Sequence, residues 1–178
     1  MCCRYAVSEA VTSRFPSLRS FGDIRPADTA PVIVADGPPV SLMTWGFMVK
    51  DKKQPVINAR CETALEKPLF RGALIRRRCA LPASWFYEWD KQKRRNTFYP
   101  ADGGILYLAG LFSDTGRFVI LTTAADDVMQ PVHDRMPLCL PEACLHDWLG
   151  DAVAAQEILG SSGAPLKRKK PMEQASLL

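Results

Sequence analysis

The sequence predicts an α+β domain in which a curved or barrel-like, mostly antiparallel β-sheet carries peripheral helices. Apolar residues make up 47% of the 178 residues, which is enough for one hydrophobic core. Polar connections at 91–96 and 113–116 separate apolar runs, as in hairpins. The central runs are rich in aromatic and β-branched residues, which favour strands at 78–81, 84–90, 97–100, 105–112 and 117–123.

The N-terminal third combines short strands with short helices, because prolines punctuate it. The Trp45-Gly46 pair indicates a kink or the close approach of another backbone. The expected strands are 31–35, 41–49 and the semi-apolar 56–60, and the expected helical segments are 4–20, ended early by Pro16, and 62–70, stopped near Pro68.

The C-terminal part is expected to supply further helices. Asp126–Val132 has Asp residues suited to cap a helix, Pro141–Leu149 is amphipathic, and Ala152–Leu159 is a third helical segment. After Gly160 the chain becomes rich in Ser, Gly, Pro and Lys. We therefore predict a domain over residues 1–160 and a flexible basic tail over residues 161–178.

The charge permits a nucleic-acid partner without requiring one. The net charge is +4, but four basic residues against Glu173 place +3 of it in the tail. Any polyanion site in the body must therefore come from local clustering. No apolar run approaches the roughly 18 residues of a membrane span, and no export signal is present, so we expect a cytoplasmic protein without a membrane partner.

The cysteines and histidines argue against a metal site. None of the six cysteines forms a CxxC pair, and without an export signal they are expected to be reduced. Cys139, Cys144 and His146 form a loose cluster, but no second half completes a zinc site. We expect neither a metal nor a cofactor.

Cys2 is the first candidate functional residue. Removal of Met1 would leave an α-amine with a pKa of about 8 beside a thiol with a pKa of about 8.5. Against an amide, the thiol would attack with the amine as base. Against an aldehyde, the amine would form an imine that the thiol closes into a five-membered thiazolidine. The alternative is a small residue at a frayed terminus.

Three further segments carry candidate groups. Asn58 and Arg60 lie two apart, on one face if the chain is extended. Glu88 stands among four aromatic residues, whose apolar surroundings raise a carboxyl pKa towards neutrality, unless it is a solvated strand residue. His133 lies in a polar turn before a proline, where a structural role is the alternative. His146, inside the predicted amphipathic helix, is expected to be a bystander.

Taken together, the motifs resemble those of the SRAP family (SOS-response-associated peptidase, or abasic-site-processing proteins) from residue 1 to about residue 150. In chain order they are Met-Cys-x-Arg-Tyr, a Trp-Gly strand, Asn-Ala-Arg-x-Glu-Thr, Arg-Arg-Cys-x-x-Pro-Ala-x-x-Phe-Tyr-Glu-Trp and His-Asp-Arg-Met-Pro. The resemblance implies a monomeric sensor that crosslinks itself to abasic sites in single-stranded DNA, a lyase-like activity, and that is associated with the nucleoid when bound.

The resemblance also implies roles for individual residues. Cys2 would form the thiazolidine with the ring-opened deoxyribose, and Asn58 would hold the N-terminus near the sugar. Glu88 would shuttle protons and assist reversal, and His133 would favour the open-chain aldehyde by bonding the sugar oxygen. The DNA-binding candidates are phosphate ligands and stacking surfaces, the latter with core packing as the alternative: Arg4, Arg60, Arg77 and Arg135, and Trp45, Phe47 and Trp85.

The sequence also departs from the family pattern. Cys3 replaces a usual glycine, and the segment Ile24–Asp28 lacks the usual asparagine. The chain is also short, and the basic tail largely replaces the family's C-terminal segment. Two other functions stay open: an N-terminal-nucleophile hydrolase or self-processing peptidase that uses Cys2 on an amide and removes Met1, and a non-covalent single-strand-binding module.

Overall fold

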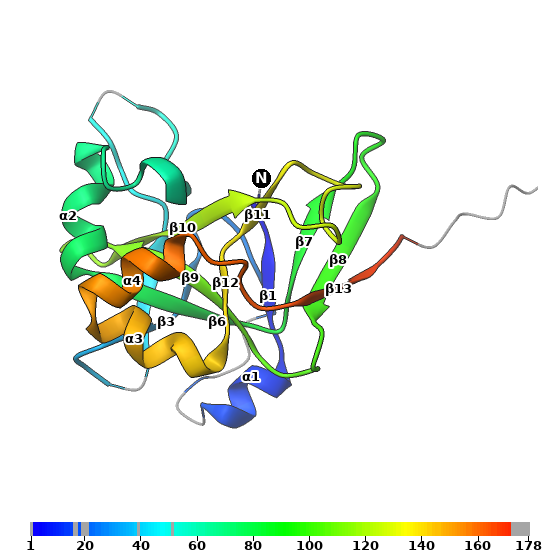
Figure 1. The fold of residues 1–178 in the computed structure, drawn as a ribbon, viewed down its shortest axis with the longest axis horizontal. Coiled ribbons are helices and arrows are strands. Elements are labelled where there is room, and N and C mark those ends of the chain that lie inside the picture. The colour runs from blue at the N-terminus through cyan, green and yellow to red at the C-terminus, as the bar shows by residue number, and fades with distance from the viewer. Residues whose placement is uncertain (1, 16–17, 19–21, 39, 51, 172–178) are drawn as a thin grey trace, which may run out of the picture.

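A closed five-stranded barrel forms the centre of the molecule (Figure 1). The computed structural model describes residues 2–15, 18, 22–38, 40–50 and 52–171. The barrel closes because β10 (Arg117–Ala124) pairs on both sides. It is antiparallel to β9 (Leu106–Phe112) and parallel to β4 (Ser41–Trp45). In order around the barrel its strands are β10 (Arg117–Ala124), β4 (Ser41–Trp45), β3 (Thr29–Val34), β6 (Arg78–Ala83) and β9 (Leu106–Phe112).

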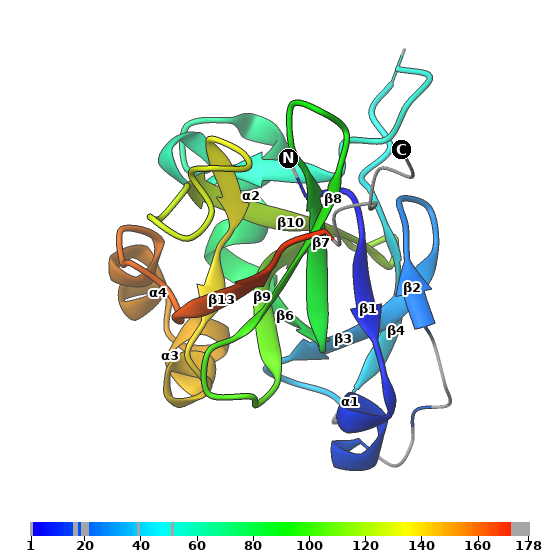
Figure 2. The ribbon, with the colours of Figure 1, turned by 90° about the vertical axis from the view of Figure 1, so that its right-hand side faces the viewer.

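Short strands extend the barrel, and a second sheet packs against it. β5 (Asn58–Arg60) pairs in parallel with β10, while β11 (Arg135–Pro137) and β12 (Cys139–Leu140) add antiparallel pairs. The second sheet is fully antiparallel and faces the viewer in Figure 2. Its order is β13 (Leu166–Lys169), β8 (Arg95–Pro100), β7 (Trp85–Trp89), β1 (Tyr5–Val7) and β2 (Gly22–Ile24).

One part of the core lies between the barrel and the second sheet, and another lies between the barrel and the helices. Phe86 of β7 stacks on Phe98 of β8 with ring centroids 5.0 Å apart, and both are fully buried. Trp45, on the barrel strand β4, belongs to the same apolar cluster. Burying such large rings contributes strongly to the stability of this fold.

The helices cover the barrel. α2 (Pro68–Arg76), α3 (Leu145–Gly150) and α4 (Ala152–Leu159) lie together on one side, and α1 (Glu9–Arg14) follows β1 (Figure 1). Trp148 anchors this helical layer, because its buried indole donates a hydrogen bond to the Cys79 carbonyl at 2.9 Å. None of the described helices is long and apolar enough to cross a membrane.

The predicted α+β class and barrel-like sheet are confirmed, and so is the role of Gly46. Its φ is +115°, and a Cβ at this position would lie 2.7 Å from Cβ of Pro55. Only glycine allows both this backbone conformation and this close approach. The central strands and α4 agree with the predicted segments to within about two residues.

Several expected helices are wrong in extent. Residues 4–20 contain strand β1 before the short α1, and Pro68 begins α2, where its missing N–H costs nothing. Pro141–Leu149 divides into a 3-10 turn and α3. Asp126 does accept a hydrogen bond from the Met129 N–H at 2.8 Å, but the segment remains a set of turns because Pro131 interrupts it.

The predicted flexible tail is wrong for Leu166–Lys169, which form β13. This strand pairs with β8 over four residues, and Leu166 buries its side chain in the core. Paired backbone groups and one apolar anchor therefore order a segment whose composition is typical of a solvated tail. Residues 172–178, the end of the predicted tail, lie outside the described residues.

Candidate active site

The structure brings Cys2 and Asn58 into direct contact. The Asn58 side-chain Nδ2 donates a hydrogen bond to the Cys2 carbonyl at 2.9 Å, and Cys2 is fully buried. Asn58 opens β5, whose parallel pairing with β10 sets its position opposite Ile120. Its buried Oδ1 accepts no hydrogen bond from the described residues. The Asn58 side chain therefore holds the N-terminal segment through Nδ2, and its Oδ1 can accept a further hydrogen bond.

The Glu88 carboxylate, on β7, acts electrostatically on the thiols of Cys2 and Cys3. The backbone N–H of Tyr87 donates to the Arg4 carbonyl at 3.0 Å, so the β1–β7 ladder continues towards Cys3 and Glu88. Glu88 is only 4% exposed. Burial raises the pKa of the Cys2 thiol well above its usual value, and the Glu88 carboxylate raises it further. The same two causes raise the pKa of Cys3.

His133 lies in the turn between β10 and β11. Its ring Nδ1 accepts a hydrogen bond from the Arg135 backbone N–H at 3.0 Å and lies 2.8 Å from the Asp134 carboxylate. Because Nδ1 accepts this hydrogen bond, Nε2 is the ring nitrogen that carries hydrogen. The ring is partly exposed and lines a groove of about 830 Å³ together with Trp89 and Ala124.

These groups have complementary chemical capacities. A thiol supplies a nucleophile, a carboxylate accepts or returns its proton, and an amide orients the segment that carries it. An imidazole beside an open groove can donate a hydrogen bond to a bound oxygen. The arrangement is therefore suited to addition of the thiol to an electrophilic carbon, with proton transfer between buried groups.

The predicted phosphate ligands differ in their availability. Arg60 is exposed, and Arg4 lies over the Trp89 ring at 5.7 Å, with an ion pair to Asp23 at 3.8 Å. Arg77 pairs with Asp114 at 3.1 Å and lines a separate pocket beside Phe47. The Arg135 guanidinium makes two hydrogen bonds to the Glu62 carboxylate and one to the Thr122 carbonyl. Its charge is already neutralised, so it serves first to hold β10, β11 and residue 62 together.

Two of the three predicted stacking residues are corrected, because they are buried in the core. Trp45 is fully buried, stacks on Phe118 and donates to the Ile57 carbonyl, so it is a core residue that cannot contact a base. Phe47 is 5% exposed and packs against Phe70. Trp85 remains partly exposed on the outer face of the second sheet. Sequence patterns do not separate these cases, because an aromatic residue in a strand can face either side.

Sequence reasoning missed Trp89, which joins several parts of the site. It lines the groove of His133, carries Arg4 over its ring, and lies opposite Cys2 if the β1–β7 register is continued. The available signal was its place next to Glu88 in the aromatic run. Among the described residues, no cluster of three or more His, Cys, Asp or Glu side chains could hold a metal ion.

Comparison with known proteins gives a consistent result. The profile of the SOS response associated peptidase (SRAP) family matches residues 1–174. The abasic site processing protein YoqW of Bacillus subtilis (strain 168) is 33% identical over 146 residues, which cover 71% of this chain and 65% of YoqW. The chain thus spans slightly less than two thirds of that relative.

Two further comparisons extend this result. The abasic site processing protein YedK of Escherichia coli (strain K12) is 32% identical over 115 residues, 59% of this chain and 52% of YedK. A crystal structure of a protein from Bordetella bronchiseptica matches with a TM-score of 0.79 at 26% identity, covering 95% of this chain and 99% of that one.

Proposed function

Because the chain belongs to the SOS response associated peptidase (SRAP) family, we propose that it captures abasic sites in single-stranded DNA covalently through Cys2. The observation that carries this proposal is the Asn58 hydrogen bond to Cys2 beside the buried Glu88. Relatives at 32–33% identity are named abasic site processing proteins, which supports the same substrate.

The chemistry begins when removal of Met1 leaves Cys2 with a primary α-amine. This amine adds to the aldehyde carbon of the ring-opened deoxyribose, and loss of one water gives an imine. The Cys2 sulfur then adds to the imine carbon, and the imine nitrogen takes up the proton that the thiol gives up. The product is a thiazolidine, which removes the activated imine before strand scission by β-elimination.

Glu88 and Asn58 fit defined parts of this sequence. The raised pKa of the Cys2 thiol keeps it protonated at neutral pH, so the thiol needs a base as the sulfur attacks. Glu88 is the carboxylate that acts on that thiol. Asn58 holds the Cys2 carbonyl, and its Oδ1 is an acceptor for the α-amine. His133 donates to the sugar oxygen from the groove and raises the open-chain fraction.

The decisive experiment uses oligonucleotides with one abasic site. Purified protein that has lost Met1 should give a band that survives a denaturing gel, and mass spectrometry should find protein plus DNA minus one water. Cys2→Ala should abolish this band. Cys144→Ala, which removes a thiol outside the site, should leave it unchanged. Absence of the band with correctly processed wild-type protein would overturn the proposal.

Two variants test the supporting residues. Glu88→Gln keeps the shape of the side chain but cannot accept a proton, so crosslink formation and reversal should slow by about 10²-fold or more. Asn58→Ala should reduce the rate through misplacement of Cys2. Formation and reversal at wild-type rates in Glu88→Gln would remove Glu88 from the mechanism.

A further inference from the structure

Four aromatic rings form a continuous row on the outer face of the second sheet. Successive ring centroids lie 6.4 Å apart from Trp89 to Tyr87, 6.5 Å from Tyr87 to Trp85, and 5.7 Å from Trp85 to Tyr99. The row faces away from the core, because Phe86 between its members points into it. Trp85 and Tyr99 remain partly exposed, so their rings are open to a ligand.

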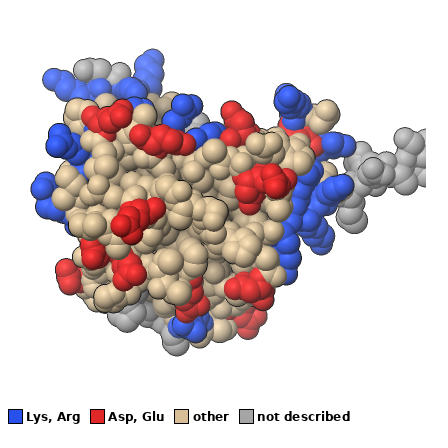
Figure 3. Space-filling model, viewed as in Figure 1, with Lys and Arg blue, Asp and Glu red and all other residues tan. Residues whose placement is uncertain are grey.

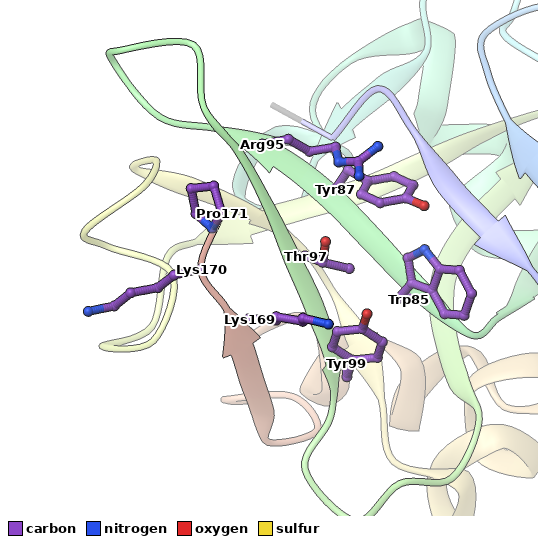
Figure 4. A pocket seen from close by; sticks show the side chains of 8 residues that line it. All are labelled: Trp85, Tyr87, Arg95, Thr97, Tyr99, Lys169, Lys170 and Pro171. Carbon is purple, nitrogen blue, oxygen red and sulfur yellow. The ribbon is translucent and has the colours of Figure 1, made fainter. Parts of the chain in front are cut away.

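Cations accompany this aromatic row. The Arg95 guanidinium lies over the Tyr87 ring at 5.0 Å, as Arg4 does over Trp89 at the other end. β13 contributes Lys169, which Figure 4 shows directed towards Tyr99, whereas Lys170 points away from the rings. Lys and Arg side chains also gather along the edge of the molecule where β8 and β13 lie (Figure 3).

The residues form a groove of about 250 Å³ with a marked charge bias. Its lining contains three basic residues and no carboxylate: Trp85, Tyr87, Arg95, Thr97, Tyr99, Lys169, Lys170 and Pro171. Asp23 lies outside this lining and accepts a hydrogen bond from the Tyr87 hydroxyl at 3.1 Å. The groove therefore favours a polyanion that also offers flat apolar surfaces.

The aromatic row connects the groove to the candidate active site. Trp89 lines the groove of His133 and is also the first ring of the row. From Trp89 to Trp85 the strand covers about 13 Å, a distance that a few nucleotides span. A DNA strand held at Cys2 can therefore continue along the aromatic row, on the same side of the molecule.

We propose that the aromatic row and its cations bind the unpaired bases and phosphates that flank the abasic nucleotide. The proposal rests on the function proposed for Cys2 and names a second contact for the same DNA strand. Every base has a face that can stack on Trp85 or Tyr99, so the contact is tolerant of sequence. It requires single-stranded DNA, because bases in a duplex already stack on each other.

Binding of undamaged DNA tests the groove separately from the chemistry of Cys2. The probe is a fluorescent single-stranded oligonucleotide without an abasic site, followed by anisotropy. Tyr99→Ala and Lys169→Glu should each weaken binding by fivefold or more. Tyr99→Phe, which keeps the ring, and Arg71→Glu, a matched charge reversal on exposed α2, should stay within twofold of wild type. The logarithm of the binding constant falls linearly with the logarithm of the salt concentration. Lys169→Glu should make this negative slope shallower by about 0.7.

Crosslinking with short and long abasic oligonucleotides completes the test. Tyr99→Ala and Lys169→Glu should slow capture of a site with long flanks, and capture of a site with one flanking nucleotide should proceed as in wild type. Circular dichroism and thermal unfolding must show that the variants fold. Wild-type affinity in both variants, with normal crosslinking, would overturn the proposed DNA-binding role of the groove and leave the Cys2 proposal standing. Absence of crosslinking in wild type would overturn the Cys2 proposal, while anisotropy would still decide the groove.

Discussion

Arg78 shows how one residue within a run acquires a distinct role. Arg76, Arg77 and Arg78 are consecutive and equivalent in composition, yet only Arg78 is buried. Its guanidinium donates to the carbonyls of Leu74, Ile75, Trp148 and Leu149, which lie in the last turns of α2 and α3. A cation at the carbonyl end of two helices satisfies acceptors that the helices leave open.

Loss of this cation should destabilise the fold without changing the chemistry of Cys2. Arg78→Met keeps much of the volume but leaves buried carbonyls without donors, so the free energy of unfolding should fall by about 3 kcal/mol or more. Urea denaturation measures the change, and Arg76→Met, at an exposed neighbour, is the control. A loss below about 0.5 kcal/mol would contradict the role assigned to Arg78.

At the scale of the element, β13 is the strand that composition conceals. Its sequence Leu-Lys-Arg-Lys contains one apolar residue, and that residue is buried. The Arg168 Nε also donates to Asn96 Oδ1 at 3.0 Å, across the strand pair. These contacts make the segment part of the second sheet and place Lys169 in the lining of the groove along the aromatic row.

A substitution at Leu166 distinguishes a docked strand from a solvated tail. Leu166→Ala should lower the free energy of unfolding by about 2 kcal/mol or more, because it leaves a cavity in the core. Lys167→Ala, at an exposed neighbour, should change it by less than about 0.5 kcal/mol. Equal, negligible effects of the two variants would show that the segment does not dock. Chemical denaturation at constant pH makes the comparison.

At the scale of the whole molecule, buried thiols make stability depend on alkaline pH. Burial raises the pKa of Cys2, Cys79 and Cys139 strongly, and that of Cys61 to about 12. In the unfolded chain these thiols ionise near pH 8.5 (a pKa of about 8.5). The folded state then keeps protons that the unfolded state releases, so its advantage is fully present below this pH and declines above it.

The free energy of unfolding should therefore fall from about pH 8.5 upwards. Each thiol contributes a slope that approaches about 1.4 kcal/mol per pH unit. Urea denaturation at pH 7, 8, 9 and 10 under reducing conditions measures this slope, and Cys79→Ala should lower it by one thiol's share. A stability that stays constant to pH 10 would contradict the prediction.

Sequence and structure agree for the features whose evidence is local in the sequence. The central strands could be predicted because their aromatic and β-branched residues are local evidence for a strand. The contact between Asn58 and Cys2 was anticipated only through the ordered motifs. Local patterns could not show that Trp45 is a core residue or that Arg135 is paired with Glu62, because both facts depend on contacts distant in the sequence.

The sequence by itself determined the α+β class, the central strands, the special role of Gly46 and the set of reactive groups. The tertiary structure decided the closure of the barrel, the docking of β13, the burial of Cys2 beside Glu88 and the aromatic row from Trp89 to Tyr99. The physical reason is that chemistry and local propensity belong to residues and short segments. Burial, pairing and electrostatic environment arise only when distant segments meet, and they set which of those residues can act.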